Sequence, residues 1–170
     1  TQLAETGLLG ITIDDAHGGQ GLGMIELALV LEEMGRAAYP GPFFSTVVLA
    51  ATALVAGGSR AQLDAYLPGI AEGSLRLQAF GVTEPGSGTD TLSLATTALR
   101  DGEHYVVNGQ KIWTSRAEHS DLMLLLARTL PKAQAKKKSD GLSVFLVDLR
   151  GASGKGLTIR FRAVVDDPFT

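Results

Sequence analysis

The sequence contains no cysteine. This absence excludes disulfide bonds, thiolate nucleophiles and cysteine-ligated metal sites, and it is typical of proteins that work in a reducing compartment. The first six residues, Thr1 to Thr6, also lack the basic leader and the cleavage pattern of a secretory signal peptide. We therefore expect this protein to reside in the cytoplasm.

Charged residues are few and nearly balanced. They make up 19% of the chain and leave a formal net charge of -3, while hydrophobic residues make up 45%. Such a composition is typical of a folded globular protein and lacks the excess of positive charge that nucleic-acid binding requires. The lysine-rich segment 131–140 is interpreted as a solvated loop, with a surface that attracts an acidic ligand or partner as the alternative. We expect no nucleic acid among the partners.

No hydrophobic run is long enough to cross a membrane. The most apolar stretch, Phe43 to Gly57, has about 15 residues against the roughly 20 that span a bilayer, and it includes a serine and two threonines. It follows the break at Pro40-Gly41-Pro42 and precedes Gly58. The pattern predicts a buried helix over residues 43–56 and no membrane span.

Several kinds of site are missing from the sequence. None of the three histidines, His17, His104 and His119, has a second histidine or a carboxylate at metal-binding spacing on a helix, so we expect no metal. The segment Gly86-Ser87-Gly88 does not form the nucleophile elbow of a serine hydrolase. The glycine-rich segment 18–23 lacks the preceding strand and the spacing of a dinucleotide-binding loop. We interpret that segment as a conformational entry to a helix.

Residues 1–76 are predicted to form a helical unit. Met24 to Ala38 places Ile25, Leu27, Ala28, Leu31 and Met34 at spacings of three and four, which predicts an amphipathic helix. After the apolar helix over 43–56, Ser59 is suited to cap a third helix that runs to about Leu67. The first part of the chain is therefore expected to be all-helical.

Residues 77–165 change to alternating patterns and two-residue turns. Strands are predicted over 95–100, 104–107, 110–114, 122–127, 142–149 and 157–161, and the strands over 122–127 and 142–149 are too uniformly apolar to have a solvated face. Asp101-Gly102 and Asn108-Gly109 are typical of tight hairpins. We predict a small, mostly antiparallel β-domain, with residues 166–170 as a short tail.

Two segments of this β-domain carry the residues with the most chemistry. Residues 79–90 (AFGVTEPGSGTD) leave an apolar strand and place hydroxyls, carboxylates and glycines in one turn, which suits a polar ligand held against the backbone. Residues 108–115 (NGQKIWTS) supply an indole followed by two hydroxyls. The alternative is a plain turn and a core tryptophan. We favour a seat for an aromatic, hydrogen-bonding cofactor. Glu84 and Asp90 are expected to brace the turn by accepting backbone N–H bonds, with acid/base roles as the alternative.

These two motifs resemble those of the acyl-CoA dehydrogenase family of flavoproteins. The resemblance extends from about Leu8 to Arg160 and includes weaker matches at residues 18–23, 32–35 and 62–68. It implies an α+β, multidomain fold: an N-terminal helical domain, a small antiparallel, β-barrel-like middle domain, and a C-terminal four-helix domain. The last has no counterpart in this sequence, so we expect a fragment of the family fold.

The resemblance also implies which residues bind FAD. They are Phe80, Val82, Thr83, Gly88, Thr89, Trp113, Thr114 and Ser115. Thr83 would contact the pyrimidine end of the flavin, Trp113 would pack against its ring system, and Ser115 would bind near its reactive nitrogen. Gly88 would let the backbone approach the ligand, and Thr89 would face the CoA part of a thioester substrate.

The activity implied by the resemblance is FAD-dependent α,β-dehydrogenation of an acyl-CoA to trans-2-enoyl-CoA, as in the β-oxidation of fatty acids and other lipids. Electron-transfer flavoprotein is the expected electron acceptor, and the full-length family form is expected to be a homo-oligomer. No catalytic base is assigned in this chain, because the family supplies it from the C-terminal domain. The alternatives are a non-catalytic FAD- or CoA-binding subunit or remnant, and a flavin monooxygenase or oxidase of the same fold.

Overall fold

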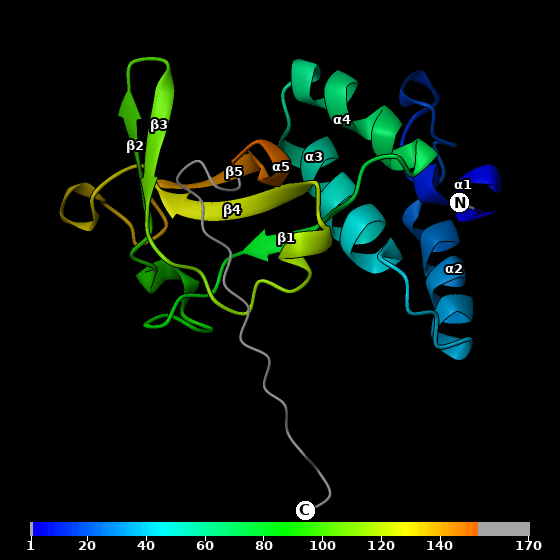
Figure 1. The fold of residues 1–170 in the computed structure, drawn as a ribbon, viewed down its shortest axis with the longest axis horizontal. Coiled ribbons are helices and arrows are strands. Elements are labelled where there is room, and N and C mark those ends of the chain that lie inside the picture. The colour runs from blue at the N-terminus through cyan, green and yellow to red at the C-terminus, as the bar shows by residue number, and fades with distance from the viewer. Residues whose placement is uncertain (1, 153–170) are drawn as a thin grey trace, which may run out of the picture.

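The computed structural model describes residues 2–152, which divide into a helical half and a single five-stranded sheet (Figure 1). The helical half contains α1 (Gln2–Glu5), the 3-10 turns η1 (Leu8–Gly10) and η2 (Asp15–His17), α2 (Met24–Arg36), η3 (Phe44–Ala51), α3 (Thr52–Gly57) and α4 (Arg60–Glu72). Strand β1 (Leu77–Gly81) leads from these helices into the sheet. The predicted order of a helical part followed by a β part is confirmed.

Helix α2 buries a narrower stripe than its sequence predicts. Leu27 is fully buried, and Val30, Leu31 and Met34 pack beside it against η1 and η3. Ile25, which was assigned to the same face, is 75% exposed. Ile25 precedes Leu27 by two residues, or about 200° around the helix, so it points away from the neighbours that cover Leu27.

The apolar stretch after Pro42 forms one continuous helical segment, as predicted. It is wound as a π-helix over η3 and continues as α3, and Gly58 follows its last residue. Its buried side chains include Val47, Ala50 and Leu54, and the Thr46 hydroxyl donates to the Leu77 carbonyl at 3.2 Å. This helix therefore supports the start of β1.

Helix α4 begins as predicted but ends later. The Ser59 hydroxyl accepts from the Gln62 amide at 3.3 Å, and the Gln62 side chain accepts from the Ser59 amide at 2.8 Å. The helix continues through Pro68 to Glu72. Burial of Leu67 and of the two residues that follow Gly69 explains the extension, because their packing outweighs the backbone hydrogen bond that proline removes.

His17 joins the glycine-rich loop to α4, a link that the sequence did not predict. Its ring is only 3% exposed, with Nδ1 at 2.5 Å from Asp14 Oδ1 and Nε2 at 2.8 Å from Asp64 Oδ1. The hydrogen bond to Asp14 and then that to Asp64 raise the pKa of His17 above its usual 6.5, because both favour the charged ring. Asp64 lies 47 residues away in sequence, so only the fold brings the pair together.

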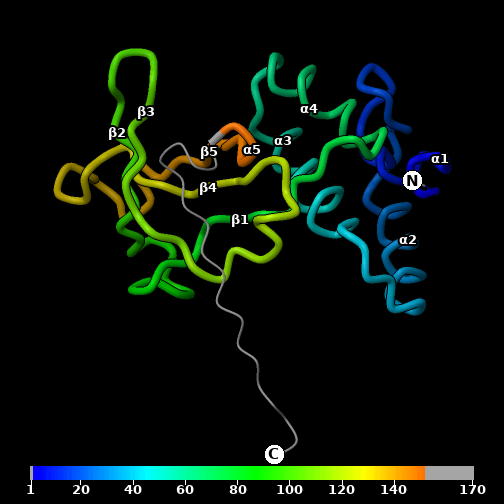
Figure 2. Tube along the Cα trace, viewed as in Figure 1, coloured from blue at the N-terminus to red at the C-terminus, as the bar shows by residue number. Residues whose placement is uncertain are grey.

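The sheet has the order β1-β4-β2-β3, with β5 paired to β4. Its further strands are β2 (Thr97–Asp101), β3 (His104–Asn108), β4 (Leu122–Arg128) and β5 (Leu142–Asp148), and α5 (Leu149–Ala152) follows. The β2–β3 and β4–β5 pairs are antiparallel, whereas β1 and β2 each pair with β4 in parallel. Figure 2 shows the β2–β3 hairpin projecting from the rest of the sheet.

Three strand predictions require correction or lie beyond the described residues. Residues 110–114 form no strand, and Asn108-Gly109 ends β3 without a hairpin, because Gly109 does not have the positive φ that a two-residue type I′ turn requires. Val144 of β5 is 62% exposed, so this strand does have a solvated position. The hairpin predicted at Asp101-Gly102 forms, with Gly102-Glu103 as its two turn residues and Gly102 at φ 60°. The predicted strand over 157–161 and the tail over 166–170 lie outside the described residues.

Candidate functional site

The two predicted motifs lie against each other. The Ile112 amide donates to the Thr83 carbonyl at 2.9 Å, and Lys111 Nζ donates to the Val82 carbonyl at 3.0 Å. Strand β1 delivers the first motif to this point, and the chain leaving β3 delivers the second. The chain that would have formed a strand over 110–114 instead binds the first motif, so the structure brings Val82, Thr83 and the tryptophan segment together.

Glu84 is the centre of this junction. Its side chain is buried, and one carboxylate oxygen lies 2.8 Å from Lys111 Nζ, whose side chain is only 8% exposed. The same carboxylate accepts from the amides of Ala95 at 2.6 Å and Thr96 at 2.9 Å. Glu84 therefore braces the turn through backbone N–H bonds, as predicted, and it also pairs with a buried lysine.

The environment of Glu84 keeps it ionised. Burial by itself raises the pKa of this carboxyl, but the hydrogen bonds from Lys111 and from the two backbone amides outweigh burial and lower the pKa from 4.5 to about 2. A carboxylate with so low a pKa and with both oxygens occupied is a poor proton acceptor. Glu84 is thus suited to hold the turn and unsuited to act as a base.

Acid should remove this stabilisation. Because the pKa of Glu84 is lower in the folded chain than in the unfolded one, its contribution is present above pH 4.5 and is lost as the pH falls toward 2. The full difference corresponds to about 3 kcal/mol. Urea unfolding of the wild type and of Glu84→Gln should show a stability gap at neutral pH that closes by about this amount near pH 2. A gap that stays constant with pH would contradict the assignment.

Asp90 braces the turn in a different way from the prediction. Its carboxylate accepts from the Ser93 hydroxyl and from no backbone amide within residues 2–152. Its backbone carbonyl accepts from the Ser87 hydroxyl at 2.6 Å. The side chain of Ser87 is therefore occupied within the turn, and the expected role of Asp90 is corrected from binding a backbone amide to binding a hydroxyl.

Trp113 projects from the protein. The indole residue is 79% exposed and has φ 58°, a left-handed conformation that is unusual for a bulky side chain. The Ser115 amide donates to the Trp113 carbonyl at 3.0 Å, which closes a three-residue turn around Thr114. Local backbone strain and a large exposed aromatic surface are both typical of ligand sites. The alternative of a core tryptophan is wrong.

The remaining predicted site residues lie along the same two segments. Phe80, Val82, Thr83 and Thr114 are partly buried, whereas Gly88, Thr89 and Ser115 are exposed. The Phe80 ring packs partly against the core around Leu77 and Leu122. No hydrogen bond among the described residues joins Gly88 or Thr89 to the second motif. Their assignment to FAD and CoA stays a prediction.

Two functional-site residues were missed by sequence reasoning. Lys111 belongs to the second motif, and the signal for its role is its position directly before Ile112 and Trp113, where burial would demand a carboxylate partner. Arg128, the last residue of β4, is 3% exposed and binds the segment that follows the first motif. Its position at the end of an apolar strand gave no comparable signal.

The chemistry of this surface fits a flavin. Side chains added at Gly86 or Gly88 would meet nothing within 4 Å, so the backbone there faces open space. The hydroxyls of Thr83, Thr89, Thr114 and Ser115 make no hydrogen bond with another described residue, and the Trp113 indole is free to pack on a ring. Exposed backbone, free hydroxyls and an aromatic face are the groups that bind a polar aromatic cofactor.

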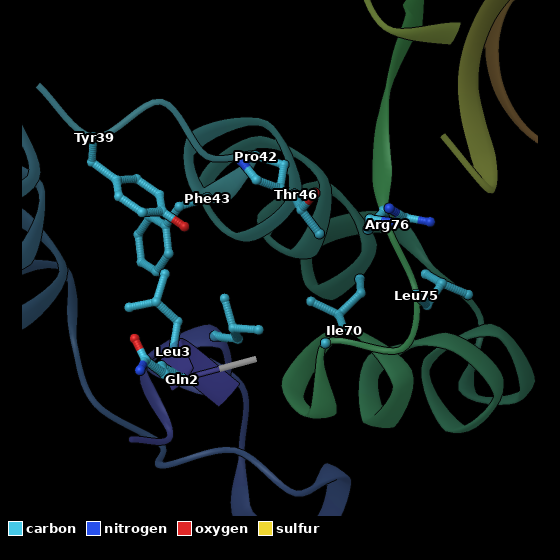
Figure 3. A pocket seen from close by; sticks show the side chains of 11 residues that line it. Gln2, Leu3, Tyr39, Pro42, Phe43, Thr46, Ile70, Leu75 and Arg76 are labelled. Carbon is cyan, nitrogen blue, oxygen red and sulfur yellow. The ribbon is translucent and has the colours of Figure 1, made fainter. Parts of the chain in front are cut away.

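A separate cavity of about 260 Å³ lies in the helical half (Figure 3). The side chains of Tyr39, Phe43 and Leu3 line one part of it, and Ile70 and Leu75 line another. None of its lining residues belongs to either motif. It is therefore distinct from the candidate cofactor surface.

Within residues 2–152 no group of three or more histidine, cysteine, aspartate or glutamate side chains is arranged to hold a metal ion. Over that range, no helix combines the length and apolar character required to cross a bilayer.

Family models match both halves of the chain. The model described as "Acyl-CoA dehydrogenase, N-terminal domain" matches residues 1–74, and that described as "Acyl-CoA dehydrogenase, middle domain" matches residues 79–164. The second match includes every predicted cofactor-contacting residue.

Curated relatives carry related names. Acyl-CoA dehydrogenase FadE26 of Mycobacterium tuberculosis is 40% identical over 86% of this chain and 36% of that protein. Mitochondrial isovaleryl-CoA dehydrogenase of Pongo abelii is 35% identical over 86% of this chain and 34% of that protein. The chain spans about a third of the length of these relatives.

Solved structures share the fold. A structure named "Tcur3481-Tcur3483 steroid ACAD" is 40% identical, with a TM-score of 0.78 over 88% of this chain and 38% of that chain. An FAD complex of PigA is 26% identical, with a TM-score of 0.76 over 86% of this chain and 38% of that chain. The resemblance carried by the two motifs is thus confirmed: the chain belongs to the acyl-CoA dehydrogenase family, whose cofactor is FAD.

Proposed function

We propose that this chain provides the FAD-binding and CoA-facing surface of an acyl-CoA dehydrogenase that converts an acyl-CoA to trans-2-enoyl-CoA. The observation that supports this most is the junction of the two motifs through Glu84 and Lys111, which presents the Trp113 indole beside free hydroxyls. When bound, FAD supplies the two-electron redox chemistry. The residues of this chain bind and orient it.

We assign to the individual side chains the roles that the family resemblance implies. Trp113 packs on the flavin ring, and the hydroxyls of Thr83 and Ser115 bind its polar edge. The open backbone at Gly88 lets the ligand approach, and Thr89 faces the CoA portion of the thioester. Glu84 and Lys111 hold the two segments in register and do not touch the reacting atoms.

The α-proton must go to a base other than Glu84. The oxygens of Glu84 already accept from Lys111 and two amides, and its pKa lies near 2. We assign the base to a carboxylate outside the described residues, in a part of the enzyme that completes the site over Trp113. This assignment also accounts for the exposure of the indole in the described chain.

The proposed substrate is defined by its CoA thioester. The relatives' names include isovaleryl-CoA, (2S)-methylsuccinyl-CoA and cyclohex-1-ene-1-carbonyl-CoA dehydrogenases, whose acyl groups differ while CoA is constant. Electron-transfer flavoprotein is the proposed electron acceptor, and a structure named for that flavoprotein from Acidaminococcus fermentans is 33% identical to this chain. The proposal also includes assembly into oligomers, cytoplasmic residence, a role in β-oxidation and the domain boundaries given above.

A titration of the chain with FAD tests the proposal directly. Trp113 is the only tryptophan, so indole fluorescence reports on this site alone. We expect a perturbed flavin absorption band and quenched indole emission, and we expect Trp113→Ala to weaken FAD binding about tenfold, the loss of roughly 1.4 kcal/mol of ring packing. Tyr39→Ala, which alters the separate cavity, should leave FAD affinity unchanged.

The outcomes separate the alternatives. A folded chain that leaves the flavin spectrum unperturbed would contradict the cofactor surface. Flavin binding with no turnover in the presence of a complementing family subunit would favour a non-catalytic subunit or remnant. Oxygen consumption that does not depend on a CoA thioester would favour a monooxygenase or oxidase of the same fold.

A further inference from the structure

Arg128 is a buried cation at the end of β4. It is 3% exposed, and no carboxylate among residues 2–152 lies within ion-pair distance of its guanidinium. A buried charge is costly unless hydrogen bonds replace its water. The structure around Arg128 must therefore supply acceptors, and the identity of those acceptors shows what the residue organises.

Backbone carbonyls are the acceptors. Nη2 donates to the Leu92 carbonyl at 2.6 Å and to that of Lys138 at 3.3 Å. Nε donates to the Leu94 carbonyl at 3.3 Å, and Nη1 to that of Asp140 at 3.4 Å. One side chain thus links the end of β4 to the segment after the first motif and to the lysine-rich loop.

The segment after the first motif is held from two sides. Glu84 accepts from the amides of Ala95 and Thr96, while Arg128 donates to the carbonyls of Leu92 and Leu94. The Arg128 amide also donates to the Thr96 carbonyl at 2.8 Å. Two buried side chains of opposite charge therefore satisfy backbone hydrogen-bonding groups of residues 92–96, which belong to no strand.

This stretch is directly connected to Thr89. The Thr91 amide donates to the Thr89 carbonyl at 3.0 Å, and the Ser93 hydroxyl binds the Asp90 carboxylate. Lys132 Nζ adds a bond to the Ser93 carbonyl at 2.7 Å. A shift of residues 92–94 would consequently move the turn that carries Thr89.

We propose that Arg128 is a positioning residue that fixes the backbone of residues 92–94 and thereby places the Thr89 turn against the CoA part of the substrate. Only the second part of this proposal, the placement of the Thr89 turn against CoA, rests on the proposed function. Lysine cannot replace arginine here, because an ammonium offers donors from one atom, whereas the planar guanidinium reaches acceptors on separate segments. Glu84 and Lys111 also join the first motif to the second, which Arg128 does not contact, so we expect loss of Arg128 to weaken coenzyme A binding more than FAD binding.

The test uses Arg128→Lys and Arg128→Met, with Arg100→Met as the matched control. Arg100 is exposed on the β2–β3 hairpin, and its guanidinium donates to one carbonyl, that of Gly102. Amide hydrogen exchange is measured on the chain without ligand, and binding of free coenzyme A and of FAD is measured by calorimetry below the unfolding temperature of each variant. Arg128→Lys keeps the buried charge, so the test can still be decided if Arg128→Met fails to fold.

We expect both Arg128 variants to exchange amides in residues 91–96 at least tenfold faster, with β1 and β5 unchanged. Coenzyme A affinity should fall about tenfold and FAD affinity less than threefold, while Arg100→Met changes none of these. Unchanged local exchange would overturn the clamp, and faster exchange with unchanged coenzyme A affinity would overturn the positioning role. A wild-type chain that binds no coenzyme A would overturn both the proposed placement of Thr89 against CoA and the CoA-facing surface. Amide hydrogen exchange would still decide whether Arg128 fixes the backbone of residues 92–94.

Discussion

Replacing Lys111 by methionine is expected to lower the free energy of unfolding by about 3 to 5 kcal/mol, because it leaves the ionised Glu84 buried without its charge partner. The two side chains are 8% and 6% exposed, so water cannot replace the lost ammonium. The same change removes the bond to the Val82 carbonyl that joins the two motifs. Urea unfolding measures the loss, and FAD titration should show weaker binding.

Two comparisons isolate the ion pair from a general effect of losing a lysine. Lys136→Met, in the exposed lysine-rich loop, should change stability by less than about 0.5 kcal/mol. The double variant Glu84→Gln with Lys111→Met should lose less stability than the sum of the single variants, because neither partner is then left charged and alone. Strict additivity would show that the pair is not coupled as its geometry indicates.

Gly19→Ala should destabilise the chain by about 3 kcal/mol, the upper end of what overpacking costs. A β-carbon at this position would overlap the carbonyl group of Ile13 and the carbonyl oxygen of Gly10, which are backbone atoms that cannot turn aside. The same loop is closed by the bond from the Gly21 amide to the Ile13 carbonyl at 2.7 Å. Thermal or urea unfolding measures the effect.

The control for Gly19 is Gly35→Ala in α2. A β-carbon there meets nothing within 4 Å, and alanine favours a helix over glycine, so stability should rise by up to about 1 kcal/mol. FAD affinity below the unfolding temperature should be the same in Gly19→Ala and the wild type, since the glycine-rich loop is a conformational element. Weakened FAD binding by a folded Gly19→Ala chain would mean that this loop contacts the cofactor.

Local patterns predicted the elements whose determinants are close in sequence. Ser59 and Gln62 cap α4 three residues apart, and Gly102-Glu103 closes the hairpin between β2 and β3. The predictions failed where distant contacts compete with a local preference. Residues 110–114 were expected to form a strand, but the Ile112 amide binds the Thr83 carbonyl instead. Helix α4 passes through Pro68 because the residues beyond it are buried.

The motifs of residues 79–90 and 108–115 placed this chain in its family, because the order of glycines, hydroxyls and an indole is a property of the chain that needs no fold to be seen. The partners of Glu84 and Arg128 required the folded structure. Each of these side chains is buried, and a buried charge is costly unless polar groups replace its water, but the groups that do so lie 10 to 36 residues away. The fold brings the segments that connect the strands within reach of these two side chains, and so it determines which charges brace the candidate site.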